Sequence, residues 1–229
     1  MRFFAEYALG VPLGAVFGIM WLFAGLFPAH LLAGAQPAAV GGVESGPLAR
    51  FSPEQREKLL AGEAIYEYVI QDGTSSSPSG YGKASVLVKA PADRCFQSFC
   101  EFDKHAQYFP HMTASRVVAS EGDFLILYKE LSFTVKTVKY YIRYKVDPAA
   151  HRVDFEMDQS RPLDIKDSGG YFHFIAVSPD TTLFDYALTK AEPGMAVPGF
   201  ISRYLTSQDL PRVVANFKQW LESGGTWKK

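Results

Sequence analysis

The sequence predicts an α+β fold in which a strongly curved antiparallel sheet wraps around one long C-terminal helix. Strand patterns follow one another through the middle of the chain, whereas helical patterns are confined to short pieces before them and to the end. The last helical pattern, Pro211–Leu221, repeats its apolar residues at helical spacing, so one face can lie against a sheet. At the other end, Ala8–Val43 contains no Asp, Glu, Lys or Arg. This run predicts an apolar membrane or signal segment ahead of the domain.

Residues 1–35 combine features of an export signal and of a membrane anchor. Ala8–Ala29 is long enough to cross a bilayer as a helix, which takes about 20 residues. Prolines near both ends leave Leu13–Phe27 uninterrupted, a length closer to the apolar core of a signal peptide, and Ala33-Gly34-Ala35 fits a cleavage site. Two interpretations stay open: a cleaved signal with a mature chain starting near Gln36, or an uncleaved anchor in the cytoplasmic membrane. Both predict an exported domain, periplasmic or otherwise extracytoplasmic.

Two short regions separate this segment from the main domain, which is expected at residues 83–223. Residues 36–50 are rich in Gly, Ala and Pro and are predicted to form a flexible linker. Residues 51–82 form an N-terminal extension. A short helix begins there at the capping box Ser52-Pro53-Glu54-Gln55, followed by a β-rich stretch at Ala64–Ile70 and a Ser/Gly/Pro loop.

The main domain begins with a strand at Lys83–Ala90, and Pro91 then opens a helix. Strict alternation in Val138–Val146 predicts a strand with one wet face, and Arg152–Asp158 repeats the pattern with an acidic outer row that can pair with the basic outer row of its neighbour. The expected strands of the run are Ser115–Ser120, Phe124–Phe133, Val138–Val146, Arg152–Asp158, Gly170–Val177 and Thr182–Lys190. Two helices follow, the first at Phe200–Ser207 and the second capped by Asp209.

Four segments of this domain, in order, resemble the START-like, Bet v 1-like superfamily, also called SRPBCC. Lys83–Asp93 resembles its first strand running into the first helix, and Phe102–Pro110 resembles the Asp-, Tyr-, Phe- and Pro-containing segment that follows. Thr181–Tyr186 resembles its penultimate strand, and Pro211–Leu221 its ligand-covering helix. The subgroup nearest in character is the coenzyme Q-binding, polyketide-cyclase-like group. The resemblance implies a helix-grip fold with an apolar ligand between sheet and helix.

The sequence offers little chemistry. It contains no Gly-rich phosphate loop and no G-x-S-x-G, H-E-x-x-H or C-x-x-C motif, and no two histidines are spaced i, i+4. We therefore predict no catalytic residue, no metal and no cofactor, and the net charge of −1 argues against nucleic acid. Cys95 and Cys100 are predicted to be free, buried thiols. His105 and His111 are expected to be exposed loop residues, with a polar rim or general base as the alternative, and His173 is expected to face solvent. The remaining acidic candidates, Asp164, Asp167 and Asp185, are expected to be ordinary surface or turn residues.

Aromatic residues are the best lead to function, at 14% of the chain with 18 Phe and 12 Tyr. Periodicity alone favours a solid core, whereas the resemblance implies a lined apolar cavity with phenol hydroxyls that orient a ligand. The expected entrance is formed by Tyr108, Phe109 and His111. The expected cavity residues are Tyr128, Tyr140, Tyr144, Phe155, Phe172, Phe174, Tyr186, Phe200, Tyr204 and Phe217.

We therefore expect a non-catalytic module that binds, and in doing so transports or chaperones, a hydrophobic small molecule such as a lipid or quinone. Its partners would be that molecule and, through the N-terminal segment, a membrane. One alternative is a cyclase- or aromatase-like enzyme that uses the same cavity. Another is an interaction scaffold whose core is filled by side chains, for which an exposed apolar patch would be the mark.

Overall fold

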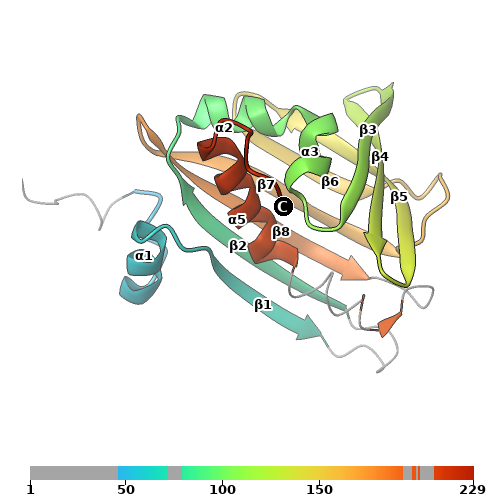
Figure 1. Cartoon of the computed structure of the whole chain (residues 1–229), viewed down its shortest axis with the longest axis horizontal. Coiled ribbons are helices and arrows are strands. Elements are labelled where there is room, and N and C mark those ends of the chain that lie inside the picture. The colour runs from blue at the N-terminus through green and yellow to red at the C-terminus, as the bar shows by residue number, and fades with distance from the viewer. Residues whose placement is uncertain (1–45, 72–78, 193–197, 200, 202–208) are drawn as a thin grey trace, which may run out of the picture. The chain divides into compact units, whose positions relative to one another are not determined.

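The computed structural model describes residues 46–71, 79–192, 198–199, 201 and 209–229 (Figure 1). The apolar segment 1–35 and the expected helix Phe200–Ser207 lie outside these described residues, so the signal or anchor stays a prediction. Among the described helices, none is both long and apolar enough to span a bilayer.

An eight-stranded antiparallel sheet forms the body of the domain, in the order β1-β2-β8-β7-β6-β5-β4-β3. Every predicted strand is present, and each lies within a few residues of its expected bounds. The first strands of the chain thus lie beside the last, because β2 pairs with β8. The strands are β1 (Ile65–Gln71), β2 (Ser79–Val88), β3 (Met112–Glu121), β4 (Phe124–Phe133), β5 (Lys136–Asp147), β6 (Arg152–Met157), β7 (Asp167–Ser178) and β8 (Thr181–Glu192).

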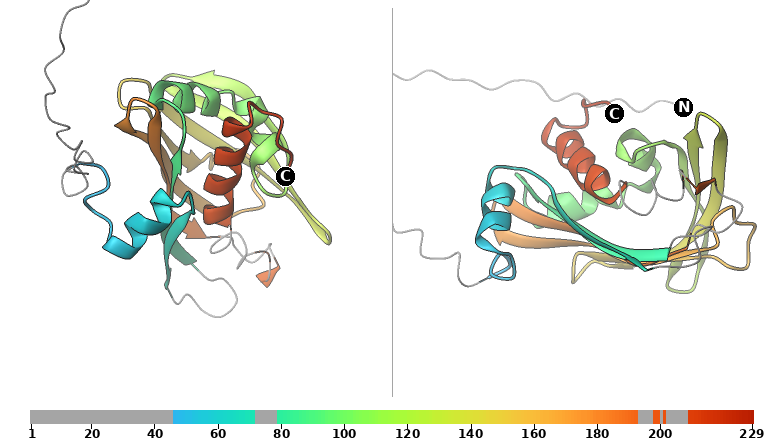
Figure 2. Two further views of the ribbon diagram at one scale, coloured as in Figure 1. Left: turned by 60° about the vertical axis from the view of Figure 1, so that its left-hand side comes forward. Right: turned by 90° about the horizontal axis from the view of Figure 1, so that it is seen from below.

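Helices cover the concave face of this curved sheet (Figure 2). They are α2 (Ala92–Phe99), the 3-10 turn η1 (Phe102–Lys104), α3 (His105–Tyr108) and α5 (Asp209–Glu222). The predicted stripe of α5 is confirmed, since Leu210, Val213, Val214, Phe217 and Leu221 are all buried. This arrangement confirms the α+β class and fits a helix-grip fold.

One half of the space between sheet and helices is filled by rings, which we call the aromatic plug. Phe99 is fully buried, and its ring centroid lies 5.3 Å from that of Phe174 and 5.9 Å from that of Phe217. Phe174 and Phe184 stack at 4.6 Å. Phe96, from the same face of α2 as Phe99, completes the plug at 6.3 Å from Phe174. The hydrophobic face of α2 therefore determines that this end of the interior is solid.

A second, smaller core lies on the other face of β2 and β8, under α1 (Pro53–Leu60). The predicted capping box is confirmed, because Ser52 and Gln55 exchange hydrogen bonds. Leu48 is buried in this core, and Arg50 forms a two-oxygen ion pair with Asp185 at 2.5 and 2.7 Å. Within the stretch predicted to be a linker, Leu48 and the guanidinium of Arg50 thus contact the domain, whereas Ala49 is exposed.

The β5–β6 hairpin pairs its outer rows as predicted. Arg143 lies opposite Glu156 with an ion pair at 3.4 Å, and Lys145 lies opposite Asp154. Asp158 was also expected to face solvent, but it is buried just past the end of β6. Its carboxylate accepts hydrogen bonds from Ser160 at 2.6 Å and Arg161 at 2.8 Å, so it fastens the turn that follows.

Candidate functional site

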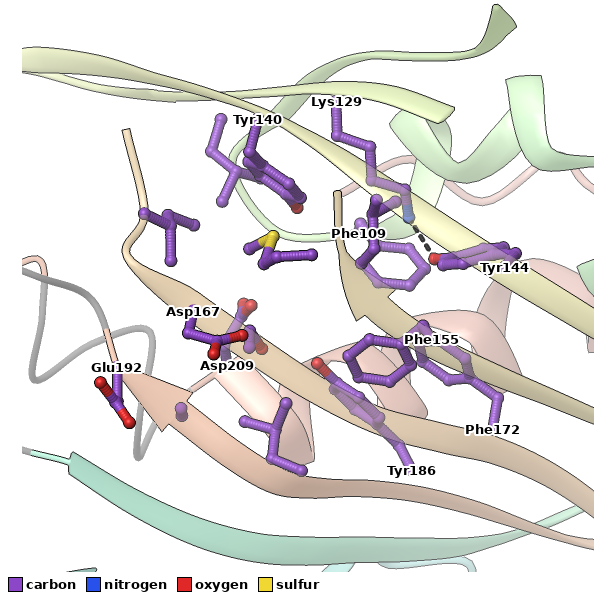
Figure 3. A pocket seen from close by; sticks show the side chains of 17 residues that line it. Phe109, Lys129, Tyr140, Tyr144, Phe155, Asp167, Phe172, Tyr186, Glu192 and Asp209 are labelled. Atoms are coloured by element: carbon purple, nitrogen blue, oxygen red, sulfur yellow. Dashed lines mark hydrogen bonds between the residues drawn. The ribbon is translucent and has the colours of Figure 1, made fainter. Parts of the chain in front are cut away.

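A cavity of about 70 Å³ lies beside the aromatic plug, between the concave face of the sheet and the start of α5 (Figure 3). Since a water molecule needs roughly 10–15 Å³ by this measure, the cavity has room for about five waters or a small organic molecule. Its walls are mainly apolar and aromatic, with a few polar groups. The lining residues are Phe109, Lys129, Leu131, Tyr140, Ile142, Tyr144, Phe155, Met157, Ile165, Asp167, Ser168, Phe172, Tyr186, Leu188, Ala191, Glu192 and Asp209.

Five of the residues expected to form a cavity lie in its wall, namely Tyr140, Tyr144, Phe155, Phe172 and Tyr186. They come from four neighbouring strands, β5 to β8, and alternate onto the concave face as the period of a strand requires. Phe109, expected at the entrance, also lies in the wall.

Other expected cavity and entrance residues lie elsewhere. Phe174 and Phe217 belong to the aromatic plug and do not line the cavity. Tyr108 is fully buried against Trp220, with ring centroids 5.0 Å apart. His111 is exposed, as one interpretation expected, and stacks on Phe133 at 4.6 Å. Phe200 and Tyr204, also expected in the cavity, lie outside the described residues.

The prediction that Tyr128 faces the cavity is wrong by one position. Tyr128 lies opposite Tyr141 in the β4–β5 ladder, and Lys129 lies opposite Tyr140. Paired residues of an antiparallel ladder point to the same face, so Tyr128 shares the outer face with Tyr141 and Lys129 shares the inner face with Tyr140. There Tyr128 donates a hydrogen bond to Glu130 at 2.8 Å.

Lys129 brings an amine into the cavity wall. Its side chain is only 2% exposed, and its Nζ lies 2.5 Å from the hydroxyl of Tyr144 and 3.2 Å from Nδ1 of His105. The rings of Phe109 and Tyr144 flank this nitrogen, each with its centroid 4.8 Å away. In the described part of the chain, no carboxylate lies within ion-pair distance of Lys129. We call Lys129, Tyr144 and His105 the lysine cluster.

Burial determines the charge of this amine. Removal from water disfavours the ammonium form and lowers the pKa of Lys129 to about 7, against an opposing pull from the carboxylate of Asp209. A large fraction of the amine is therefore uncharged at neutral pH. A surface lysine would be protonated under the same conditions.

His105 is fully buried, so the expectation of an exposed loop residue is wrong. Its Nε2 lies 2.8 Å from the carbonyl oxygen of Phe99, an acceptor only, so Nε2 carries the proton and Nδ1 presents its lone pair to Lys129. Burial and the neighbouring Lys129 lower the pKa of His105 well below its ordinary value, so the ring is neutral. Its ring stacks on Phe109 at 4.8 Å, which holds it in place.

Asp209 contributes a carboxylate at the other side of the cavity (Figure 3). Its Oδ1 is buried and has no hydrogen-bond partner among the described residues. Burial raises the pKa of Asp209 to about 7, although Arg212 and Lys129 pull it in the opposite direction. From the sequence Asp209 was expected only to cap α5, whereas the first turn of α5 places its carboxylate at the cavity.

The cavity wall also contains two neutral phenols, those of Tyr140 and Tyr186. Burial raises the pKa of Tyr140 and of Tyr186, and the nearby carboxylate of Asp209 raises both further. At the ends of β7 and β8, Asp167 and Glu192 lie at the edge of the cavity and are neutralised by pairing with Lys190 and Lys166 respectively. The polar side chains of the wall that are left to meet a ligand are therefore Lys129, Tyr144, Ser168, Asp209 and the two phenols.

Other residues singled out in the sequence, an aspartate and the two cysteines, lie away from the cavity wall. Asp185 is 1% exposed rather than a surface residue, and accepts bonds from Arg50, Lys83 and Ser85. Cys95 and Cys100 are free thiols, the first buried and the second half-buried. Among the described residues, no cluster of three or more His, Cys, Asp or Glu side chains could hold a metal ion.

Comparison with solved structures places this geometry in a known fold. A STAR-related lipid transfer protein from Xanthomonas axonopodis matches with a TM-score of 0.53 at 14% identity, over 68% of this chain and 98% of that one. The Zhui aromatase/cyclase from Streptomyces sp. R1128 matches with a TM-score of 0.52 at 12% identity, over 70% and 99%. The chain has a START-like fold.

A START superfamily protein from Mycobacterium smegmatis agrees, with a TM-score of 0.51 at 16% identity over 71% of this chain and 99% of that one. The resemblance predicted from four short segments is thus confirmed at the level of the fold. No known family profile and no curated protein matches the sequence. START-like proteins with such different names share this architecture, so the function of this chain must be argued from its own cavity.

Proposed function

We propose that this protein binds a small hydrophobic molecule with one polar group in the cavity between β4–β8 and α5. The observation that carries the proposal is an interior with free volume beside an aromatic plug that has none. An apolar wall with a few convergent polar groups is the usual composition of a small-molecule site. The buried Oδ1 of Asp209, which has no partner in the described part of the chain, supports a ligand that supplies a donor, because buried polar atoms are usually paired.

The ligand classes that fit best are a lipid-like molecule with a short apolar part or a single quinone-sized ring. The volume of about 70 Å³ is far below what a full acyl chain needs, so a larger ligand requires the walls to move apart. The apolar N-terminal segment supports delivery of such a ligand at a membrane, on the outer side of the cytoplasmic membrane. Binding without turnover is the main proposal.

The experiment is native mass spectrometry of the full chain from a membrane-containing host, followed by solvent extraction and identification of what is released. The proposal expects one apolar molecule per chain. The matched variants are Ala191→Phe, which fills the cavity from its wall, and Val118→Phe, which adds the same ring at an exposed position on β3.

Ala191→Phe should lose the bound molecule, while Val118→Phe should retain it. Retention in both variants would indicate that the ligand is held by another part of the chain, such as the apolar N-terminal segment. An empty wild-type protein that also fails to take up lipids and quinones would count against the proposal and favour an interaction role.

A further inference from the structure

Lys129 is unusual among the polar residues of this cavity. Among the described lining residues it is the sole lysine or arginine, and it reaches the interior from the middle of a strand whose flanking inward residues are Leu127 and Leu131. A buried cation without a carboxylate partner is costly to the fold. A buried lysine of this kind commonly serves a ligand or a reaction and is commonly uncharged. An uncharged amine is a nucleophile.

Two neighbouring side chains, His105 and Tyr144, hold the nitrogen of Lys129 in position. Because Nε2 of His105 donates to the carbonyl of Phe99, Nδ1 can only accept, so it takes one N–H of Lys129. The hydroxyl of Tyr144, 2.5 Å from Nζ, is both donor and acceptor. The lysine nitrogen thereby lies between two rings, at the wall of the cavity (Figure 3).

We propose that Lys129 captures hydrophobic aldehydes or ketones in this cavity as a Schiff base. The amine nitrogen adds to the carbonyl carbon to give a carbinolamine, and the C–O bond then breaks. The carbonyl oxygen leaves as water with the two protons that the nitrogen loses, so the products are one imine and one water, with no change of oxidation state. The inference rests on the proposed function and specifies it, because it names the polar group of the ligand as a carbonyl.

Neighbouring groups can move both protons. Nδ1 of His105 already accepts a hydrogen bond from the lysine nitrogen and lies where a proton leaves it. The hydroxyl of Tyr144, 2.5 Å from Nζ, is close enough to pass a proton to the oxygen of a carbinolamine formed at that nitrogen. His105 contacts the reacting nitrogen directly and does not line the cavity. Burial raises the pKa of Tyr144 well above its ordinary value, so its proton is present at neutral pH.

The surroundings favour the imine once it has formed. Imines hydrolyse in water, and the aromatic walls formed by Phe109, Phe155 and Phe172 limit water around Nζ. Tyr140 and Tyr186 are neutral donors that can orient a further oxygen of the ligand. The other described lysines lie at the surface or in ion pairs, as Lys83 does with Asp185, or hydrogen-bond to backbone carbonyls, as Lys229 does.

The test is reductive trapping with cinnamaldehyde, a small apolar aldehyde, and sodium cyanoborohydride on the full chain at neutral pH. Peptide mapping by mass spectrometry then locates the reduced adduct. We expect one adduct per chain at Lys129, formed faster by at least ten-fold than adducts at surface lysines. Tyr144→Phe should slow labelling of Lys129 by about ten-fold or more, since general acid catalysis commonly contributes that much.

Two controls separate this inference from the proposed function. Lys129→Met removes the amine but keeps an apolar side chain of similar length, and Lys145→Met makes the same change at an exposed position. Only Lys129→Met should abolish the fast adduct. Cinnamyl alcohol, which has the same shape without a carbonyl, should bind without forming an adduct.

If the alcohol binds and the aldehyde labels only surface lysines, the Schiff-base inference is wrong while the binding function stands. If neither compound binds in the cavity, both are wrong for ligands of this size.

Discussion

The two ends of the interior contain the same kind of side chain and behave differently. At one end, Phe96, Phe99, Phe174, Phe184 and Phe217 touch ring against ring and leave no space. At the other end, four of the aromatic residues, Tyr140, Tyr144, Phe155 and Tyr186, surround a cavity with a lysine and a carboxylate in its wall. The difference lies in what covers them, because α2 inserts two phenylalanines into the first end only. Aromatic content therefore does not distinguish a core from a binding site.

The largest expected effect is on stability and concerns the filled end. Phe99→Ala should lower the free energy of unfolding by about 4 kcal/mol, because it opens a void among rings in contact on all sides. Phe155→Ala, the matched change at the cavity, should cost about 2 kcal/mol, since that ring already faces free space. Urea unfolding of both variants measures the difference. Equal losses would mean that the cavity is packed in solution.

Two buried carboxylates sharpen the same contrast. Asp185→Asn should cost about 2 kcal/mol, because the buried carboxylate loses its charged hydrogen bonds to Arg50, Lys83 and Ser85, while the two partly exposed cations can still be hydrated. Within the described residues Asp209 forms no ion pair, so Asp209→Asn should change mainly the pH dependence of stability. The pKa of Asp209 is raised from 3.8 to about 7 in the folded protein, so the folded state binds its proton more tightly.

The stabilisation from Asp209 is therefore fully present below about pH 4 and is lost as the pH rises to about 7. Asp209→Asn should flatten the unfolding free energy over this window, measured at several pH values. Lys129 does not interfere there, because its pKa falls from 10.5 to about 7 and its effect lies above neutral pH. An unchanged slope in the variant would show that Asp209 titrates normally.

The smallest effect is expected on the outer face. Tyr128→Phe removes one hydrogen bond, to Glu130, from a partly exposed position and should change stability by less than about 0.5 kcal/mol. Ligand affinity should not change, whereas Tyr186→Phe should weaken it, because that hydroxyl borders the cavity. Calorimetric titration of both variants with cinnamyl alcohol provides the comparison. A loss of affinity in Tyr128→Phe would contradict the assigned orientation of β4.

Sequence patterns predicted the strands, the apolar stripe of α5 and the inward direction of Tyr140 and Tyr144, because each depends on local periodicity. The same patterns missed Lys129. The prediction that Tyr128 faces inward implied that its neighbour Lys129 faces outward, whereas the pairing of Lys129 with Tyr140 fixes it inward. The alternation within β4 alone does not show which of its two faces is inward. That depends on the register between β4 and β5, which pairs Tyr128 with the outward Tyr141.

His105 and Asp209 were missed for a related reason. Each lies in the first turn of a helix, where a polar residue is usually a surface cap, and nothing local shows that both point to the same interior. The extent of the aromatic plug was equally hidden, since it depends on where α2 crosses the sheet. The sequence patterns thus did not predict contacts between helices and strands that lie far apart along the chain.

The pairing of β2 with β8 also bears on how the chain becomes folded. Ser85 and Asp185 join across 100 residues, and Arg50 and Asp185 across 135. Contacts of such separation slow folding, and refolding of sheets of this kind takes on the order of milliseconds to seconds. On the ribosome, the first strands must wait for the last before the sheet can be completed. The sheet can therefore reach its native pairing only after β8 has been synthesised.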